Sequence, residues 1–515
     1  MRIRRFGLLA ILLVAGAVTT SALAQASPSG TLVVALDATP ANLDQMSNTT
    51  LEVVFPAGHI YETLFAFDTS FRPQPGLVES YEVDETGSTW TFTLRQGVLF
   101  HNGDTMTVDD VEASYNRWRT TSQIARQWDD VIFERIDDNT FRLVSLTARG
   151  NMLFDLAQTS QALVISPAEV IEGVAANELT EYIGTGPFMF DSMVPDQYVR
   201  VRAFPDYVSR DEPSSGRAGG KEALVEMVEF RIIKDVPTRV AALRAGEIDV
   251  VPAGISGSDR PTLEADPDIT VQIVRGFQKW GPIFNGARPL GGNQVLRQAV
   301  AAVLDHEELA LAMVGDPDLF EIHPGLPIAD SFFSSDVAAD SFDQRDPDKA
   351  RRLLEEAGYN GEELVIISTK SNVLQDKMAT VMEAQLEEIG MNVRIDWYDG
   401  ATIRQVRTQP DQWDIIPAGW GTTFDPAIYG QAFTCESGSW TGHCYPELDE
   451  IFERAAEAFD PGDRKEIYEE LQRAMLEEFV PQILLADFHA LRAYRSNLSG
   501  VQDYKDFIAW NVSKE

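Results

Sequence analysis

Basic residues are scarce in this 515-residue chain. Lys and Arg number 42 against 80 Asp and Glu, which gives a net charge of −38. Nucleic-acid binding depends on cationic side chains that displace phosphate counterions, so nucleic acid is excluded as a partner. An anionic membrane surface is excluded for the same reason. A solvated acidic surface keeps a protein soluble and separate from its copies, so we expect a monomer.

Long apolar runs are also lacking beyond the first residues. Phe6 to Val18 is apolar but too short to span a bilayer comfortably. Arginines precede it at positions 2, 4 and 5, and the small-x-small site Ala22-Leu23-Ala24 follows. This pattern predicts a secretory signal peptide over 1–24, cleaved after Ala24, with an uncleaved anchor as the alternative. No Cys follows the cleavage site to carry a lipid, so we expect a free protein in a bacterial periplasm.

Cysteine occurs only at Cys435 and Cys444, in the Gly/Ser-rich stretch CESGSWTGHC. In an exported protein a pair this close favours a disulfide. A zinc site would add His443, but that supplies only three ligands at a non-standard spacing. The sequence therefore predicts a disulfide and no metal.

Catalytic motifs are missing as well. The sequence has no HExxH, GxSxG or GxxxxGK[ST] motif and no GxGxxG after a strand. The glycine-rich GTGPF at 184–188 runs into Pro187, so it does not open a phosphate-binding helix. We expect neither a cofactor nor an enzyme. The alternative from another class is a secreted hydrolase with a carboxylate pair, but among so many acids no pair stands out.

Segments with helical and strand periodicity alternate along the chain. Trp90, Phe92 and Leu94 alternate with threonines, which predicts a half-buried strand. A helix is predicted to begin at Pro237 and end at Gly246, with a strand at 248–251. The Gly/Ser-rich stretch 209–220 is predicted to be a surface loop. Helix followed at once by strand, several times over, predicts α/β layers with mixed sheets.

A series of segments resembles the family-5 extracellular solute-binding proteins of bacterial ABC importers. The resemblance begins with YETL and FHNG, and it continues in the family's order over nearly the whole chain beyond the predicted signal peptide. Its segments are 60–118, 184–190, 204–208, 239–251, 293–309, 347–359, 419–426 and 444–455. Two departures are Leu43-Asp44-Gln45, which lacks the Pro of LDP, and Pro75-Gly76-Leu77, which replaces P-x-L-A.

The resemblance implies an α/β, two-lobed, hinged periplasmic binding protein of type II, of the larger class with an extra subdomain. The ligand cleft would lie between lobes that close by a hinge motion. Lobe 1 would be discontinuous, with residues 25–55, 180–275 and 488–515. The extra subdomain would be 56–179, and lobe 2 would be 276–487.

The resemblance also implies the function. We expect the periplasmic substrate-binding component of an ABC importer, which captures di- or oligopeptides and delivers them to a permease in the inner membrane. The same scaffold binding an oligosaccharide, an opine or a nickel complex is the alternative.

Two candidate ligand contacts lie in the GWGTTFDP segment. In the resembling dipeptide binders the Asp of this segment, here Asp425, holds the peptide α-ammonium through a charge-assisted hydrogen bond. The alternative is an Asp that caps the turn before Pro426. Trp420 is expected either to pack on a ligand side chain or to lie in the core.

Four further candidates come from the rest of predicted lobe 2. Trp280 and Asn285 are candidate ligand contacts, with a backbone tie at the hinge as the alternative for Asn285. Lys370 aligns roughly with the family segment that supplies an Arg for the peptide carboxylate, and Arg404 is the second choice. Only Arg offers a planar bidentate fork, so this Lys leaves open a longer ligand or one without a carboxylate.

Overall fold

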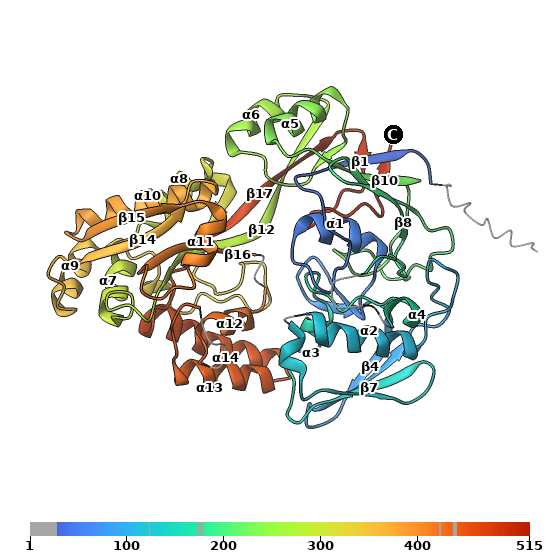
Figure 1. Ribbon diagram of the computed structural model, residues 1–515, viewed down its shortest axis with the longest axis horizontal. Helices are drawn as coiled ribbons and strands as arrows, with labels where there is room; N and C mark the ends of the chain where they lie inside the picture. The colour runs from blue at the N-terminus through green and yellow to red at the C-terminus, as the bar shows by residue number, and fades with distance from the viewer. Residues whose placement is uncertain (1–27, 123, 173, 175–178, 422–423, 436–439) are drawn as a thin grey trace, which may run out of the picture.

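Two lobes joined by a pair of long strands make up the computed structural model (Figure 1). The structure describes residues 28–122, 124–172, 174, 179–421, 424–435 and 440–515. The predicted signal peptide lies outside the described residues. Within them, no helix combines the length and the apolar character needed to cross a membrane.

One mixed sheet runs through both lobes. Its strand order is β15-β14-β16-β12-β17-β11-β1-β10-β9-β8, and β13 pairs with β17 beside this path. β1 is parallel to β10 and β11, and β14 is parallel to β15 and β16, whereas the other pairs are antiparallel. The bounds are Thr31–Leu36 (β1), Phe188–Val194 (β8), Tyr198–Ala203 (β9), Met227–Ile232 (β10), Val250–Val251 (β11), Ile269–Phe284 (β12), Phe320–Glu321 (β13), Glu363–Thr369 (β14), Asn392–Tyr398 (β15), Ile415–Gly421 (β16) and Ala486–Arg495 (β17). The predicted α/β class is confirmed.

The long strands β12 and β17 connect the lobes. They pair antiparallel, and their register shifts between Val274 and Gln278. Gly276 lies in this irregular stretch with φ +56°, a left-handed conformation that favours glycine. The expected boundaries near residues 275 and 488 fall inside these two strands. We propose that the hinge lies here; the predicted lobe boundaries stay a proposal.

The predicted extra subdomain contains a four-stranded antiparallel sheet. Its order is β4 (Val78–Val83), β5 (Thr89–Leu94), β7 (Thr140–Val144) and β6 (Ile132–Arg135). On β5 the side chains of Trp90, Phe92 and Leu94 are buried and the alternate threonines are half-buried, as the alternation predicts. Burying one face of the strand in this way is what fixes its register.

Helix ends follow the sequence signals. α5 (Val236–Ala245) begins after Asp235, whose side chain accepts from Thr238 N, and it ends at Gly246 with φ 74°. The prediction for this helix is confirmed. The remaining helices are α1 (Leu51–Ile60), α2 (Val108–Thr121), α3 (Met152–Leu156), α4 (Ala168–Ile171), α6 (Arg260–Glu264), α7 (Gln294–Val303), α8 (His306–Val314), α9 (Pro347–Glu356), α10 (Val373–Glu388), α11 (Gly400–Val406), α12 (Gly430–Phe433), α13 (Pro446–Glu457) and α14 (Pro461–Arg473). Short strands are β2 (Phe65–Phe67), β3 (Pro73–Pro75), β18 (Leu498–Ser499) and β19 (Ser513–Lys514).

The second half of the 209–220 stretch is not at the surface, so the prediction of a surface loop is wrong there. Arg217 is buried, and its Nε donates to Asp506 Oδ2 at 2.9 Å. A buried guanidinium needs such a partner, and only the C-terminal segment supplies it.

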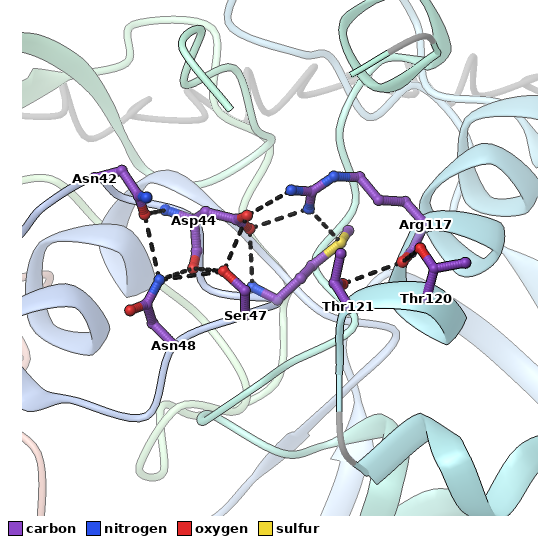
Figure 2. Close-up of polar contacts among 8 residues, drawn as sticks. Asn42, Asp44, Ser47, Asn48, Arg117, Thr120 and Thr121 are labelled. Carbon is purple, nitrogen blue, oxygen red and sulfur yellow. Dashed lines mark hydrogen bonds and ion pairs between the residues drawn. The ribbon is translucent and has the colours of Figure 1, made fainter. Parts of the chain in front are cut away.

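A buried ion pair fixes the segment 42–48 to α2 (Figure 2). Arg117 on α2 donates from Nη1 to Asp44 Oδ1 at 3.0 Å, and both side chains are buried. Ser47 Oγ donates to the same carboxylate, and Asn48 Nδ2 donates to the Asp44 carbonyl. Asp44 belongs to the Leu43-Asp44-Gln45 departure, so this carboxylate keeps a structural role without the proline.

The lobes also contact each other away from the long strands, where α14 and α13 approach α3 in Figure 1. Phe424 packs on Phe71, with ring centroids 5.5 Å apart, and Gly150 N donates to the Ala456 carbonyl at 2.6 Å. Phe154 and Phe333 are 5.3 Å apart across the same contact. These contacts join the two lobes at a second place, away from the long strands.

Candidate functional site

The carboxyl ends of three parallel strands frame a pocket of about 500 Å³. Thr369 ends β14, Gly400 follows β15, and Trp420 lies near the end of β16. Open α/β sheets bind their ligands at this edge, and pockets of this volume accept small molecules. The pocket is also lined by Trp280 of β12, by Ser371, Asn372 and Gln375 around the start of α10, by Arg404 of α11, and by Arg407, Gln431 and Trp440.

Tryptophans and isoleucines form most of the apolar lining of this pocket. Trp280 pairs with Gly419 across β12 and β16, and a Cβ on Gly419 would lie 2.3 Å from the Trp280 ring. Glycine is therefore required for the indole to lie against β16. The indole N–H groups of Trp280 and Trp420 donate to Gln278 and Gln482, each at 2.8 Å. Trp280 is buried in the core of its lobe, and the Trp420 ring packs edge-on against Tyr429, with ring centroids 5.1 Å apart.

Among the described residues that line the pocket, the charged side chains are both arginines. Arg407 lies over the Trp440 ring, 5.1 Å from its centroid. The Arg404 guanidinium is exposed and has neither an ion pair nor a hydrogen bond to the part of the chain that the structure describes. An arginine with free donors can bind a carboxylate through two parallel hydrogen bonds.

Of the six predicted ligand residues, Trp280, Trp420 and Arg404 line this pocket, and Asp425, Asn285 and Lys370 do not. The Lys370 side chain is 69% exposed; its ammonium is 3.8 Å from Asp376 and 4.2 Å from the Trp397 ring centroid. No ligand is present, so ligand contact stays a prediction for all six.

Asn285 is fully buried just beyond β12. Its Nδ2 donates to the carbonyls of Pro410 and Trp413, and its Oδ1 accepts from Ala287 N. Both ends of the side-chain amide are therefore hydrogen-bonded to backbone groups. These bonds favour the alternative that Asn285 ties backbone segments together. The segments that it ties belong to one lobe, however, and not to both sides of the hinge.

Asp425 takes part in the contact between the lobes. Its Oδ2 is 2.8 Å from Arg464 Nη2, and its Oδ1 accepts from Tyr468 Oη at 2.6 Å and from Ala427 N at 2.9 Å. The last bond caps the short turn Pro426–Tyr429, so Asp425 has the capping role that the alternative gave it, but the capped turn begins at Pro426 instead of preceding it. Arg464 Nη1 also donates to the Gly150 carbonyl of the other lobe at 3.4 Å.

Asp155 on α3 faces this cluster from the first lobe. Desolvation raises its pKa to about 7, the Asp425 charge adds to the rise, and the hydrogen bond from Trp128 and the charges of Arg464 and Arg149 lower it. Its Oδ2 accepts from Trp128 Nε1 at 2.9 Å and Asn151 Nδ2 at 2.7 Å. An acid with this pKa is partly protonated near neutral pH.

The disulfide between Cys435 and Cys444 is present, which confirms its prediction. It closes the loop that carries Trp440, which lines the pocket. The sequence did not single out Trp440, its pocket neighbour Arg407, or Arg464 at the contact between the lobes. An aromatic residue between two close cysteines was the available signal for Trp440. Within the described residues, no cluster of three or more His, Cys, Asp or Glu side chains is arranged to hold a metal ion.

Comparison with known proteins agrees with this architecture. The chain is 28% identical over 485 residues to a probable peptide ABC transporter periplasmic-binding protein, y4tO, of Sinorhizobium fredii, with 88% of each chain covered. A dipeptide-binding protein from Pseudoalteromonas sp. SM9913 in complex with Met-Leu superposes with a TM-score of 0.78 at 23% identity, over 94% of this chain and all of that one. The binding protein AgaA from A. tumefaciens R10 in complex with agropinic acid gives 0.76 at 23% identity, over 94% and 99%.

The sequence pattern of one family covers most of the chain, from residue 72 to residue 441. This span includes most of the predicted extra subdomain, the strand β12 and most of predicted lobe 2. The chain therefore belongs to the bacterial extracellular solute-binding proteins, family 5.

Proposed function

We propose that this protein is the substrate-binding component of an ABC importer, and that it captures peptides in the periplasm and delivers them to an inner-membrane permease. The observation that carries the proposal is the pocket of about 500 Å³ at the strand ends of one lobe of a two-lobed fold. Family membership and the peptide-binding names of its relatives support it. The basic, then apolar, start of the chain supports export by a signal peptide cleaved after Ala24.

The work of such a protein is capture and closure without covalent chemistry. A ligand that binds the closed form better than the open form shifts the population toward closure. The irregular stretch of β12 supplies the bending point, and the contact around Phe424 and Arg464 joins the lobes when they close. The permease then binds the closed form and accepts the ligand from it.

A second ligand class has support from one comparison. AgaA shares the fold and holds agropinic acid, an opine, in its solved structure. An oligosaccharide, an opine or a nickel complex therefore stays an alternative to a peptide. A hydrolase with a carboxylate pair stays the alternative of another class, and the same experiment separates it.

The test is binding against turnover on one sample. Protein purified without its predicted signal peptide is mixed with a defined di- and tripeptide set, and melting temperature and peptide masses are followed together. We expect a ligand-dependent rise in melting temperature with every peptide intact. Peptide cleavage that survives repurification would favour the hydrolase.

Pocket residues are tested with two matched tryptophan variants. Trp420→Ala removes a ring that lines the pocket, whereas Trp397→Ala removes a partly exposed ring on β15 that does not. We expect Trp420→Ala to weaken binding about tenfold or more, since buried aromatic anchors dominate binding energy. Equal losses in the two variants would place the site elsewhere.

A further inference from the structure

A second cavity, of about 30 Å³, lies in the first lobe, where α1 meets the C-terminal segment. Its lining includes Gly58 of α1, Glu62, Arg217, Lys221 and Trp510, which are far apart in the sequence. A space of about 10 to 15 Å³ is enough for one water molecule, so this cavity accommodates one small ion or about two waters. The charges and hydrogen bonds around it decide between these occupants.

Arg217 brings unused hydrogen-bond donors to this cavity. Its Nε donates to Asp506, but neither Nη1 nor Nη2 has a hydrogen bond to the residues that the structure describes. A Cβ on Gly58 would lie 2.2 Å from Arg217 Nη1, so only glycine leaves room for the guanidinium. The Trp510 indole N–H is also buried without a partner among these residues, and Lys221 Nζ lies 5.1 Å from the Trp510 ring centroid.

The two buried carboxylates beside the cavity already accept hydrogen bonds from other groups. The donors are Lys221, Tyr207 and Thr185 for Glu62, and Arg217 Nε and Lys505 for Asp506. Neither carboxylate accepts from the Nη groups of Arg217. A further acceptor is therefore needed in the cavity, because a buried donor without a partner is costly.

The buried charges here have a positive excess. Glu62 and Asp506 form ion pairs with three bases at 2.7 to 3.0 Å, and none of these side chains is more than 11% exposed. Two more buried arginines act on these acids and donate only to neutral oxygens. If the half-buried Asp68 is counted with the acids, the bases still outnumber them. The bases of this basic cluster are Arg95, Arg217, Lys221, Arg492 and Lys505.

His59 adds no charge to the basic cluster. Its Nε2 accepts from Ala509 N at 2.9 Å, and its Nδ1 donates to the Phe55 carbonyl at 2.7 Å, which is the pattern of a neutral ring. Burial lowers the pKa of His59 to about 3, the bond to Phe55 raises it, and the charges of Arg217 and Lys221 lower it. The positive excess therefore persists at neutral pH, and an uncompensated charge inside a protein is costly.

We propose that this cavity binds a small monovalent anion, a chloride held by the Nη groups of Arg217, as the counterion of the basic cluster. The ion joins α1, the 209–220 stretch and the C-terminal segment, which meet at the cavity. A pair of water molecules would satisfy the donors but leave the charge without compensation. The site is separate from the solute pocket, which lies in the other lobe.

The first test locates the ion. The chain without its predicted signal peptide is crystallised in the absence of halide, the crystals are soaked in sodium bromide, and anomalous scattering is measured at the bromine absorption edge. We expect a bromide ion in the cavity, within hydrogen-bond distance of Arg217 Nη1 or Nη2. Ordered water alone in the cavity would overturn the proposal.

The second test measures selectivity. The melting temperature is followed at constant ionic strength as sodium chloride replaces sodium methanesulfonate, whose anion is too large for the cavity. We expect the melting temperature to rise with chloride and then to saturate, because an ion that binds only the folded state stabilises it. Equal melting temperatures in the two salts would contradict a chloride site.

A matched pair of variants assigns the ligand. Arg217→Lys keeps a cation beside Asp506 but removes both Nη groups, whereas Arg200→Lys makes the same exchange at an arginine that pairs with Glu229 outside the cavity. We expect Arg217→Lys to need about tenfold more chloride for the same stabilisation, since hydrogen bonds to charged groups are strong, and Arg200→Lys to follow the wild-type curve. An unchanged chloride response in Arg217→Lys would overturn the assignment. The bromide experiment uses the unaltered side chains, so it decides the matter even where a variant does not fold.

Discussion

Arg464 on α14 lies 2.8 Å from the Asp425 carboxylate and reaches the Gly150 carbonyl of the opposite lobe. Its guanidinium also packs among the rings of Phe154, Phe333 and Tyr468. One buried arginine thus both compensates a buried carboxylate and bridges the lobes.

Arg464→Met is expected to lower the free energy of unfolding by about 3 to 5 kcal/mol, because it leaves Asp425 buried without a cation. Urea denaturation gives the value. Adding Asp425→Asn to this variant should recover part of the loss, since the unpaired charge disappears. No recovery in the double variant would show that Arg464 acts through packing alone.

Asp155 is expected to make stability depend on pH. Its pKa of about 7 lies above its ordinary value of 3.8, so between these pH values the folded protein keeps a proton that the unfolded chain has released. The free energy of unfolding should therefore decline as pH rises through this window and level off above it. Asp155→Asn should remove this part of the decline, on the order of 1 kcal/mol or more between pH 5 and pH 8. Superimposable stability profiles for the two proteins would contradict the raised pKa.

Replacing both Cys435 and Cys444 by Ser should lower the free energy of unfolding by about 2 to 3 kcal/mol, as expected for a loop of about ten residues. Because the loop carries Trp440, ligand affinity should fall as well. Thermal unfolding with and without reductant provides the check: the wild-type protein should shift and the double variant should not. A reductant shift in the variant would point to another cause.

Asp44→Asn should cost about 3 to 5 kcal/mol, because Arg117 loses the carboxylate that compensates it (Figure 2). Asp129→Asn is the matched control, since that carboxylate is 89% exposed and 3.7 Å from Arg119. The control should change stability by less than about 1 kcal/mol. Urea denaturation of the two variants side by side decides the matter; similar values would mean that burial of the Asp44 pair contributes little.

Local patterns determined most of the fold that the sequence could predict. The alternation of Trp90 and Phe92 with threonines sets one face of β5, and Asp235 and Gly246 bound α5 through hydrogen bonds within a few residues. The two cysteines, Cys435 and Cys444, allow only one pairing, and their close spacing favoured it. Each of these features depends on neighbours in sequence, which the chain displays directly.

Tertiary structure alone decided what the candidate site residues contact. Asp425 and Lys370 carry the charges that the expected peptide termini need, yet the fold turns the first toward Arg464 and leaves the second beside Asp376 and outside the pocket. The side-chain amide of Asn285 is similarly hydrogen-bonded to the backbone carbonyls of residues 410 and 413. The energy of a buried polar group depends on which remote segment brings it a partner, and residue type and local spacing do not carry that information.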